Sequence, residues 1–191
     1  MTAAPPPLYI LRHGETEWNL SGRLQGRYDS PLTPRGIAQA RAQRDILRQR
    51  DLSRFAAISS PQGRARETAR IALEGLIAPV RTDPALSEIG LGDWAGETRE
   101  TLIAETGARD GFDLYELAPG GEGFAALHRR CEAFLRRLTR PSVLVTHGIT
   151  SRMLRLVLTE RPIGALRDMD GGQGVIFYLE NGRQERLSIG A

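Results

Sequence analysis

The sequence of 191 residues contains no lysine, because all 26 of its basic residues are arginine. A lysine Schiff base and a P-loop lysine are therefore both excluded as catalytic devices. Arginine stays charged and binds phosphate or carboxylate through a planar fork of donors. A genome-wide preference for arginine codons would produce the same composition, so this bias alone assigns no function.

Cysteine and histidine are also scarce. The single cysteine, Cys131, has no partner for an internal disulfide and rules out a multi-cysteine metal site. The three histidines are scattered without a recognisable ligand spacing. We therefore expect neither a metal nor another cofactor.

Long apolar runs are missing as well. No segment approaches the roughly 20 residues that cross a membrane, and residues 1–7 lack the basic region and apolar core of a secretory signal. We expect a cytoplasmic protein with no membrane partner and a flexible, Pro-rich leader at residues 1–7. The length suits a single domain over residues 1–191, and 40% hydrophobic residues suffice for a core.

The expected elements alternate between strands and helices. Strands are predicted at residues 8–11, 55–59, 79–82 and 142–146, and helices at residues 34–50, 64–77, 124–138 and 149–158. A hairpin around Asn181-Gly182 is expected to pair residues 175–179 with 185–189. The Gly-rich segment at about 87–123, with a short helix near 97–105, is expected to form a cap or insert over the functional site. This order predicts an α/β fold, a three-layer α/β/α sandwich with a mainly parallel central sheet.

Basic and imidazole side chains follow the predicted parallel strands. In such sheets, ligands bind beyond the carboxyl ends of the strands. One strand ends at Arg12-His13, another leads into Arg64, and a third ends at His147-Gly148. Two arginines and two histidines are therefore expected to meet at one edge of the sheet.

These residue types suit a phosphoryl group. A neutral imidazole is a competent nucleophile toward phosphorus, and neighbouring cations lower the pKa of that imidazole. Arg12, Arg64 and His147 would bind the phosphoryl oxygens around His13. The glycines after both histidines would admit backbone N–H groups, and the helix after His147 would direct its amino terminus toward the anion.

A leaving alkoxide also needs a proton donor. Glu88, at the start of the Gly-rich segment, is the best candidate for this acid. Glu15 and Glu17 are its rivals by position, and otherwise they are ordinary acidic residues at the start of a loop or helix.

These residues resemble the histidine phosphatase superfamily, and within it the phosphoglycerate-mutase-like branch. The similarity extends from about residue 8 to residue 158 and lies in separate blocks. These are Arg12-His13-Gly14-Glu15-Thr16 with Asn19, GlyArgLeuGlnGly at 22–26 with LeuThrProArgGly at 32–36, SerSerProGlnGlyArgAlaArgGluThrAla at 59–69, Leu86-Ser87-Glu88 through Gly92, Trp94 and Gly96, and ValThrHisGly at 145–148. A lone Arg-His-Gly is a weak signal, whereas several blocks in the right order are a strong one.

The resemblance implies a metal-free mechanism whose catalytic residues are His13, Glu88, Arg12, Arg64 and His147. The first histidine would attack phosphorus and become a phosphohistidine, while both arginines and the second histidine would bind the transferring group. The glutamate would protonate the leaving oxygen and then activate water. The implied substrate-binding residues are Asn19, Gln25 and Gly148.

Phosphatases and mutases of this family share such a site. The cofactor-dependent mutases carry a considerably longer segment between the acid and the second histidine, whereas Glu88 and His147 are 59 positions apart. A shorter cap leaves a phosphohistidine open to water, which favours a phosphomonoesterase acting on a small phosphorylated metabolite, of the sugar phosphate or phospho-acid class. A phosphoglycerate mutase is the alternative. Two motifs depart from the family's usual pattern. The usual Trp-Glu-Gly is replaced by Trp94-Ala95-Gly96, and the usual Gly-Glu-Ser by Gly121-Glu122-Gly123, so the resemblance does not name the substrate.

A binding module is the alternative from another class. Residues 34–54 hold six arginines against two aspartates, which would suit a nucleic-acid-binding face. No aromatic residues interleave for base stacking, and a solvated helix face explains the charge equally well. We expect a small-molecule substrate and no nucleic acid partner. The sequence leaves the oligomeric state open, a homodimer included.

Overall fold

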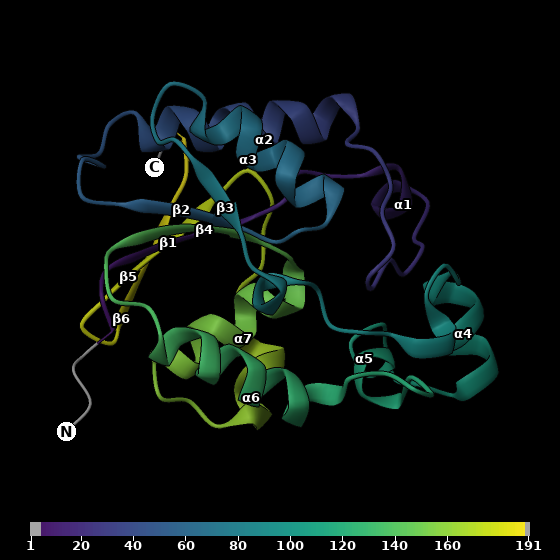
Figure 1. Ribbon diagram of the computed structural model, residues 1–191. Helices are drawn as coiled ribbons and strands as arrows, with labels where there is room; N and C mark the ends of the chain where they lie inside the picture. Colours follow the sequence, from purple (N-terminus) through teal and green to yellow (C-terminus); the bar gives the residue numbers. More distant parts are fainter. Residues whose placement is uncertain (1–4, 190–191) are drawn as a thin grey trace.

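The centre of the protein is a six-stranded sheet in the order β3–β2–β4–β1–β5–β6 (Figure 1). The structure is a computed structural model and describes residues 5–189, so residues 1–4 of the expected leader lie outside the described part. The strands are β1 (Leu8–Arg12), β2 (Ala56–Ser59), β3 (Val80–Thr82), β4 (Ser142–Thr146), β5 (Ile176–Glu180) and β6 (Arg183–Leu187). β1 to β4 are mutually parallel, and β5 and β6 add an antiparallel hairpin beside β1. The prediction of a mainly parallel sheet is confirmed.

Helices cover both faces of the sheet. α2 (Pro34–Leu47) and α3 (Gly63–Leu73) lie on one face, and α6 (Gly123–Arg136) and α7 (Gly148–Leu158) lie on the other (Figure 1). The short helices α1 (Glu17–Leu20), α4 (Arg99–Thr106) and α5 (Leu114–Leu117) lie together toward one end of the molecule. Three 3₁₀ helices complete the described elements, at Pro84–Leu86, Gly92–Trp94 and Ile163–Asp168. The three-layer α/β/α sandwich is confirmed, and within residues 5–189 no helix has the length and apolar character that a membrane crossing requires.

Several predicted boundaries were wrong, for local reasons. The second strand of the hairpin occupies Arg183–Leu187 instead of 185–189, because the tight turn at Asn181-Gly182, with φ of 51° and 73°, leads directly into it. α3 ends at Leu73 instead of residue 77, because Gly75 has a φ of 72°. α2 ends at Leu47, and Gln49 N and Arg50 N then donate to Ile46 O and Leu47 O in tighter i→i+3 turns. The single-turn helices α1 and α5 are too short to show an amphipathic period.

The sheet separates two hydrophobic cores. Successive residues of β1 point to opposite faces, so Leu8 and Ile10 join the core with α6 and α7, whereas Tyr9 and Leu11 join the core with α3. Cys131 lies in the first of these cores, where burial raises the pKa of its thiol to about 12. The prediction that this cysteine belongs to the core is confirmed.

A close approach between two backbones fixes α2 against the segment that follows β1. Thr33 caps the helix as predicted, and its side chain accepts a hydrogen bond from Gly36 N. A Cβ on Gly14 would lie 2.2 Å from the carbonyl oxygen of Gly36. The Gly14 N–H donates to Thr68 Oγ1 at 3.0 Å. The expectation that the backbone N–H at Gly14 binds an anion was therefore wrong, because α2 packs against this glycine and its N–H already donates to Thr68.

Gly14→Ala is expected to lower the free energy of unfolding by about 3 kcal/mol, because the added methyl group overlaps rigid backbone. Urea denaturation measures this change. Gly164→Ala is the matched control, since a Cβ at that position meets nothing within 4 Å. Equal stability of the two variants would contradict the packing role of Gly14.

Candidate active site

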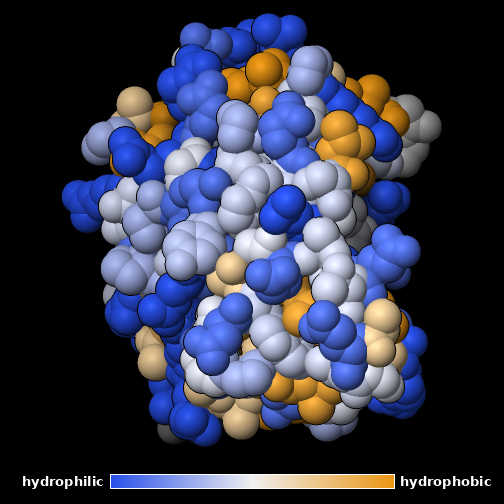
Figure 2. Space-filling view, turned by 90° about the vertical axis from the view of Figure 1, so that its right-hand side faces the viewer, coloured by the Kyte–Doolittle hydropathy of each residue, from blue (hydrophilic) through white to orange (hydrophobic). Residues whose placement is uncertain are grey.

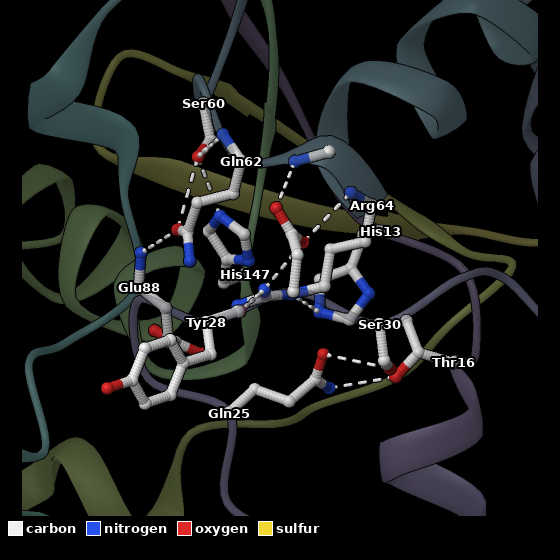
Figure 3. A network of polar contacts seen from close by, with 12 residues as sticks. His13, Thr16, Gln25, Tyr28, Ser30, Ser60, Gln62, Arg64, Glu88 and His147 are labelled. Carbon is white, nitrogen blue, oxygen red and sulfur yellow. Dashed lines mark hydrogen bonds and ion pairs between the residues drawn. The ribbon is translucent and has the colours of Figure 1, made fainter. Parts of the chain in front are cut away.

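Three adjacent strand ends bring the predicted residues together. β1 and β4 are paired with Arg12 opposite Thr146, so His13 and His147 both stand one residue beyond their strands. Their ring centroids lie 5.1 Å apart. Arg64 is the second residue of α3 and reaches the same place (Figure 3). The convergence expected from the sequence is observed.

His13 is buried and has a defined tautomer. Its Nδ1 lies 2.7 Å from its neighbour's carbonyl oxygen, Gly14 O, which accepts a hydrogen, so Nε2 carries the lone pair. That Nε2 accepts a hydrogen bond from Arg64 Nε at 3.3 Å. Burial, reinforced by the charges of Arg12 and Arg64, holds the pKa of His13 well below 6.5. The nucleophilic nitrogen of a neutral imidazole is therefore available at the site.

The orientation of His147 follows from Ser60, the residue after β2. Ser60 Oγ lies 2.7 Å from His147 Nε2 and 3.3 Å from Gln62 Oε1. The single hydroxyl hydrogen of Ser60 is donated to Gln62 Oε1, and the same oxygen engages Nε2 of His147. Nδ1 is buried and has no hydrogen-bond partner among the described residues. An unpaired buried polar nitrogen is costly, so it marks a place for a hydrogen-bond partner from outside the described residues.

We expect both imidazoles to stay neutral as the pH falls through 6.5, because burial, first of all, holds the pKa values of His13 and His147 well below that value. In the unfolded chain both take up protons near pH 6.5, so the unfolded state binds more protons below it. Stability is therefore full above this pH and decreases as the pH falls toward the folded pKa values. NMR titration of the ring nitrogens, assigned with His13→Gln and His147→Gln, measures the two pKa values in the folded protein. Protonation of either imidazole at or above pH 6.5 would contradict the prediction that both stay neutral.

A loop carboxylate that the sequence reasoning missed holds Arg64. Asp29 Oδ1 accepts hydrogen bonds from Arg64 Nη1 at 2.9 Å and from Arg64 N at 3.1 Å. Arg64 Nη2 donates to Gly26 O at 3.0 Å. Asp29 thus caps α3 and orients the guanidinium at once. The two residues are 35 positions apart, so no local spacing in the sequence signals the pair.

Glu88 lies at the amino terminus of α7. Its carboxylate oxygens accept hydrogen bonds from Ile149 N at 3.2 Å and from Thr150 N and Thr150 Oγ1, both at 3.0 Å. The expectation that this helix directs its amino terminus toward a substrate anion needs correction, because the carboxylate of Glu88 binds there. The buried Gln62 side chain accepts a hydrogen bond from Glu88 N at 2.8 Å and fixes the backbone as well (Figure 3).

Two predicted binding residues meet at Thr16. Gln25 Nε2 donates to Thr16 Oγ1 at 2.8 Å (Figure 3). Asn19 Oδ1 accepts from Thr16 N at 3.3 Å and from Gln173 Nε2 at 3.2 Å, which leaves the Asn19 Nδ2 hydrogens as donors. Gln173 is 154 positions from Asn19 and lies in a Gly-rich turn, so the sequence pattern did not indicate it.

Three further residues have roles that the sequence left open. Gly148 lies against an arginine, and a Cβ there would make ordinary van der Waals contact with Arg12 Cζ at 3.4 Å, so space alone does not require a glycine. Glu15 accepts a hydrogen bond from Thr33 Oγ1 at 2.9 Å, so its carboxylate supports the start of α2. The unusual Gly123 has a φ of 68°, which disfavours the serine that the family pattern has there.

A cavity of about 370 Å³ opens beside these groups. It is lined by His13, Glu88, Asn19, Gln25 and Gly148, and by five arginines, Arg12, Arg23, Arg64, Arg99 and Arg152. Leu91, Phe112, Tyr115 and Ile149 add apolar wall. Of the five cations, the sequence reasoning had identified Arg12 and Arg64. The others sit in segments where a surface arginine is the ordinary expectation.

The family model described as histidine phosphatase superfamily (branch 1) matches residues 8–187. The chain belongs to this superfamily. This histidine phosphatase superfamily member is 38% identical over 162 residues to the adenosylcobalamin/alpha-ribazole phosphatase of Salmonella typhimurium, with 80% of this chain and 79% of that protein covered. It is 35% identical over 159 residues to a probable phosphoglycerate mutase of Proteus mirabilis, covering 74% of this chain and 69% of the relative.

Solved structures of other superfamily members have the same fold. The alpha-ribazole phosphatase from Shigella flexneri superposes with a TM-score of 0.81 at 28% identity, covering 97% of this chain and 96% of that one. A mycobacterial glucosyl-3-phosphoglycerate phosphatase, solved with VO3, superposes with a TM-score of 0.80 at 32% identity, covering 92% and 91% of the two chains. The family and fold expected from the sequence blocks are confirmed.

Proposed function

We propose that the protein is a phosphomonoesterase that acts through a phosphohistidine on a small phosphorylated metabolite. One observation carries this proposal. The lone pair of His13 Nε2 belongs to a neutral imidazole that lines a cavity together with the guanidinium groups of Arg12 and Arg64. A nucleophile without a proton, beside two guanidinium groups of which Arg12 Nε has no hydrogen-bond partner among the described residues, suits attack on a dianionic phosphate.

The reaction divides into two displacements at phosphorus. In the first, a bond forms between His13 Nε2 and phosphorus while the bond to the leaving oxygen breaks, and the Glu88 carboxyl gives that oxygen its proton. In the second, the Glu88 carboxylate takes a proton from water, the resulting oxygen attacks phosphorus, and the bond to Nε2 breaks. Arg12, Arg64 and His147 bind the equatorial oxygens in both steps. Asn19 and Gln25 border the same place and contribute to binding.

Hydrolysis and mutase activity differ in the acceptor of the phosphoryl group. The relatives include an alpha-ribazole phosphatase and a probable phosphoglycerate mutase. We favour water as the acceptor, because only 59 positions separate Glu88 from His147, which makes residues 87–123 a short cap. Leu91, Arg99 and Tyr115 from this segment line the cavity, in agreement with such a cap.

The proposed setting is a single-domain cytoplasmic enzyme without a metal or a nucleic acid partner. Within residues 5–189 no group of three or more His, Cys, Asp and Glu residues is placed to hold a metal ion. Arg44, on the Arg-rich helix α2, donates to Glu74, the residue after α3, at 2.7 Å, so part of that charge serves helix packing. The oligomeric state stays open.

A steady-state assay with p-nitrophenyl phosphate, run beside a phosphoglycerate mutase assay, tests the proposal. We expect hydrolysis that continues undiminished in EDTA, with no comparable transfer between the two phosphoglycerates. Strong inhibition by EDTA would contradict the metal-free mechanism, and mutase turnover faster than hydrolysis would reverse the choice of acceptor. A screen of phosphorylated metabolites then ranks substrates by kcat/KM.

A further inference from the structure

The cavity carries more positive charge than the proposed phosphoryl site uses. Arg12 and Arg64 stand beside His13, whereas Arg23, Arg99 and Arg152 extend the lining beyond it. None of these three takes part in any ion pair formed within residues 5–189. Guanidinium groups gathered in a concave site without counter-charges attract an anion.

Backbone pairing sets two of these cations next to each other. Arg23 forms an antiparallel bridge with Thr98, and Arg99 N donates to Gly22 O at 3.1 Å. The loop after α1 and the start of α4 are therefore joined as a short ladder. Arg23 and Arg99 project from adjacent backbone segments although they are far apart in the sequence.

The Arg99 side chain is held in place by neutral partners only. Its Nη2 donates to Tyr115 Oη at 2.7 Å and its Nη1 donates to Gly111 O at 3.3 Å. Its Cζ lies 5.4 Å from the centroid of the Tyr115 ring. These contacts orient the guanidinium and leave its positive charge uncompensated.

Arg152 reaches the cavity from α7. Its Nε is buried and has no hydrogen-bond partner among the described residues. A Cβ on Gly171 would lie 2.6 Å from Arg152 Nη2, so the absence of a side chain at Gly171 makes room for this guanidinium. The position thus combines a fitted space with an unused donor, which indicates an acceptor from outside the chain.

The two carboxylates of the cavity do not serve as counter-ions for these arginines. Asp110 pairs with Arg167, and Glu88 accepts hydrogen bonds from the backbone at the start of α7. The face formed by α1, α4 and α5, seen in Figure 2, is mostly hydrophilic with smaller hydrophobic areas. A polar ligand therefore fits this end of the molecule better than an apolar one.

We propose that Arg23, Arg99 and Arg152 form a second anion subsite, which selects phosphomonoesters that carry a second acidic group. This inference rests on the proposed phosphatase function and names its substrate class. The second group is a carboxylate or a second phosphate, because both accept paired hydrogen bonds from a guanidinium fork. A cavity of about 370 Å³ holds a small diacid of this kind, with its carbon atoms beside Leu91 and Phe112.

Two matched substrate pairs test the subsite on the unmodified protein. 3-Phosphoglycerate and glycerol 3-phosphate differ in a carboxylate against a hydroxymethyl group, and propane-1,3-diol bisphosphate and propyl phosphate differ in a second phosphate. We expect kcat/KM to favour the more acidic member of at least one pair by about 10- to 100-fold, the worth of one or two charge-assisted hydrogen bonds. The pair with the larger ratio identifies the second group.

Arg23→Gln, Arg99→Gln and Arg152→Gln are expected to bring that ratio toward one, whereas Arg41→Gln, on the exposed side of α2, keeps it. Residual hydrolysis of p-nitrophenyl phosphate identifies a folded variant. Ratios near one for both pairs in the unmodified protein would overturn the subsite, even if no variant folds. Failure of the unmodified protein to hydrolyse any phosphomonoester would instead overturn the proposed function.

Discussion

His13→Ala is expected to lower kcat for p-nitrophenyl phosphate by at least about 10⁴-fold, because removal of a nucleophile leaves only binding and electrostatic effects. The cavity and its arginines remain in this variant, since the imidazole leaves from the end of β1 and not from either hydrophobic core. Burst kinetics and labelling with ³²P from a labelled substrate measure the loss directly. We expect an acid-labile, base-stable label on the unmodified protein and none on His13→Ala.

The matched control for this loss is His128→Ala. This histidine is half-buried on α6, outside the cavity, and no function is assigned to it. The control should keep both turnover and label. Label that persists in His13→Ala would show that another residue is the nucleophile, with His147 the first to test.

Glu88→Gln is expected to separate substrates by their leaving groups. An alkyl phosphate releases a strongly basic alkoxide that needs a proton, so its kcat should fall by about 10²- to 10⁴-fold. p-Nitrophenolate leaves without protonation, so the same variant should lose less than about 10-fold on the aryl phosphate. Measuring both substrates in parallel gives the ratio of the two losses in kcat. An unspecific disturbance of the site lowers both values alike and does not change this ratio.

Glu15→Gln is the control for the acid, because Glu15 was its rival by sequence position. Its carboxylate supports Thr33 at the start of α2, so the variant should affect both substrates alike. Equal losses of the alkyl and aryl substrates in Glu88→Gln would assign the proton to another group. A selective alkyl loss in Glu15→Gln would assign it to Glu15.

The elements marked by an apolar run, an apolar stripe at helical spacing or a helix cap were predictable. β1 and β4 are short apolar runs, α6 carries an apolar stripe through Cys131, and α2 begins with Thr33-Pro34. Local periodicity and capping encode these elements, and chain order then favours parallel pairing. The predicted ends of elements were wrong where a left-handed glycine or a tight turn ended an element, because the conformation of a single residue decides where such an element stops.

The candidate site divides in the same way. Residues placed immediately beyond a strand, His13 and His147, were predictable because a parallel sheet collects the carboxyl ends of its strands at one edge. Asp29, Gln173 and the contacts that hold Glu88 were not, because each joins segments far apart in the chain through polar side chains. Contacts of this kind produce no regular spacing of residues that could be recognised in the sequence.

The sequence by itself determined the family, and it indicated the candidate nucleophile and its first cations, since these depend on residue types at strand ends and on ordered motif blocks. The tertiary structure alone decided which glycine packs against a helix, which nitrogen of His13 carries the lone pair, and which arginines line the cavity. The physical reason is that local charge, free space and hydrogen-bond partners depend on which residues lie close together in the folded protein. Arg23, Arg99 and Arg152 have no motif around them in the sequence, and they come together only when folding brings them around one cavity.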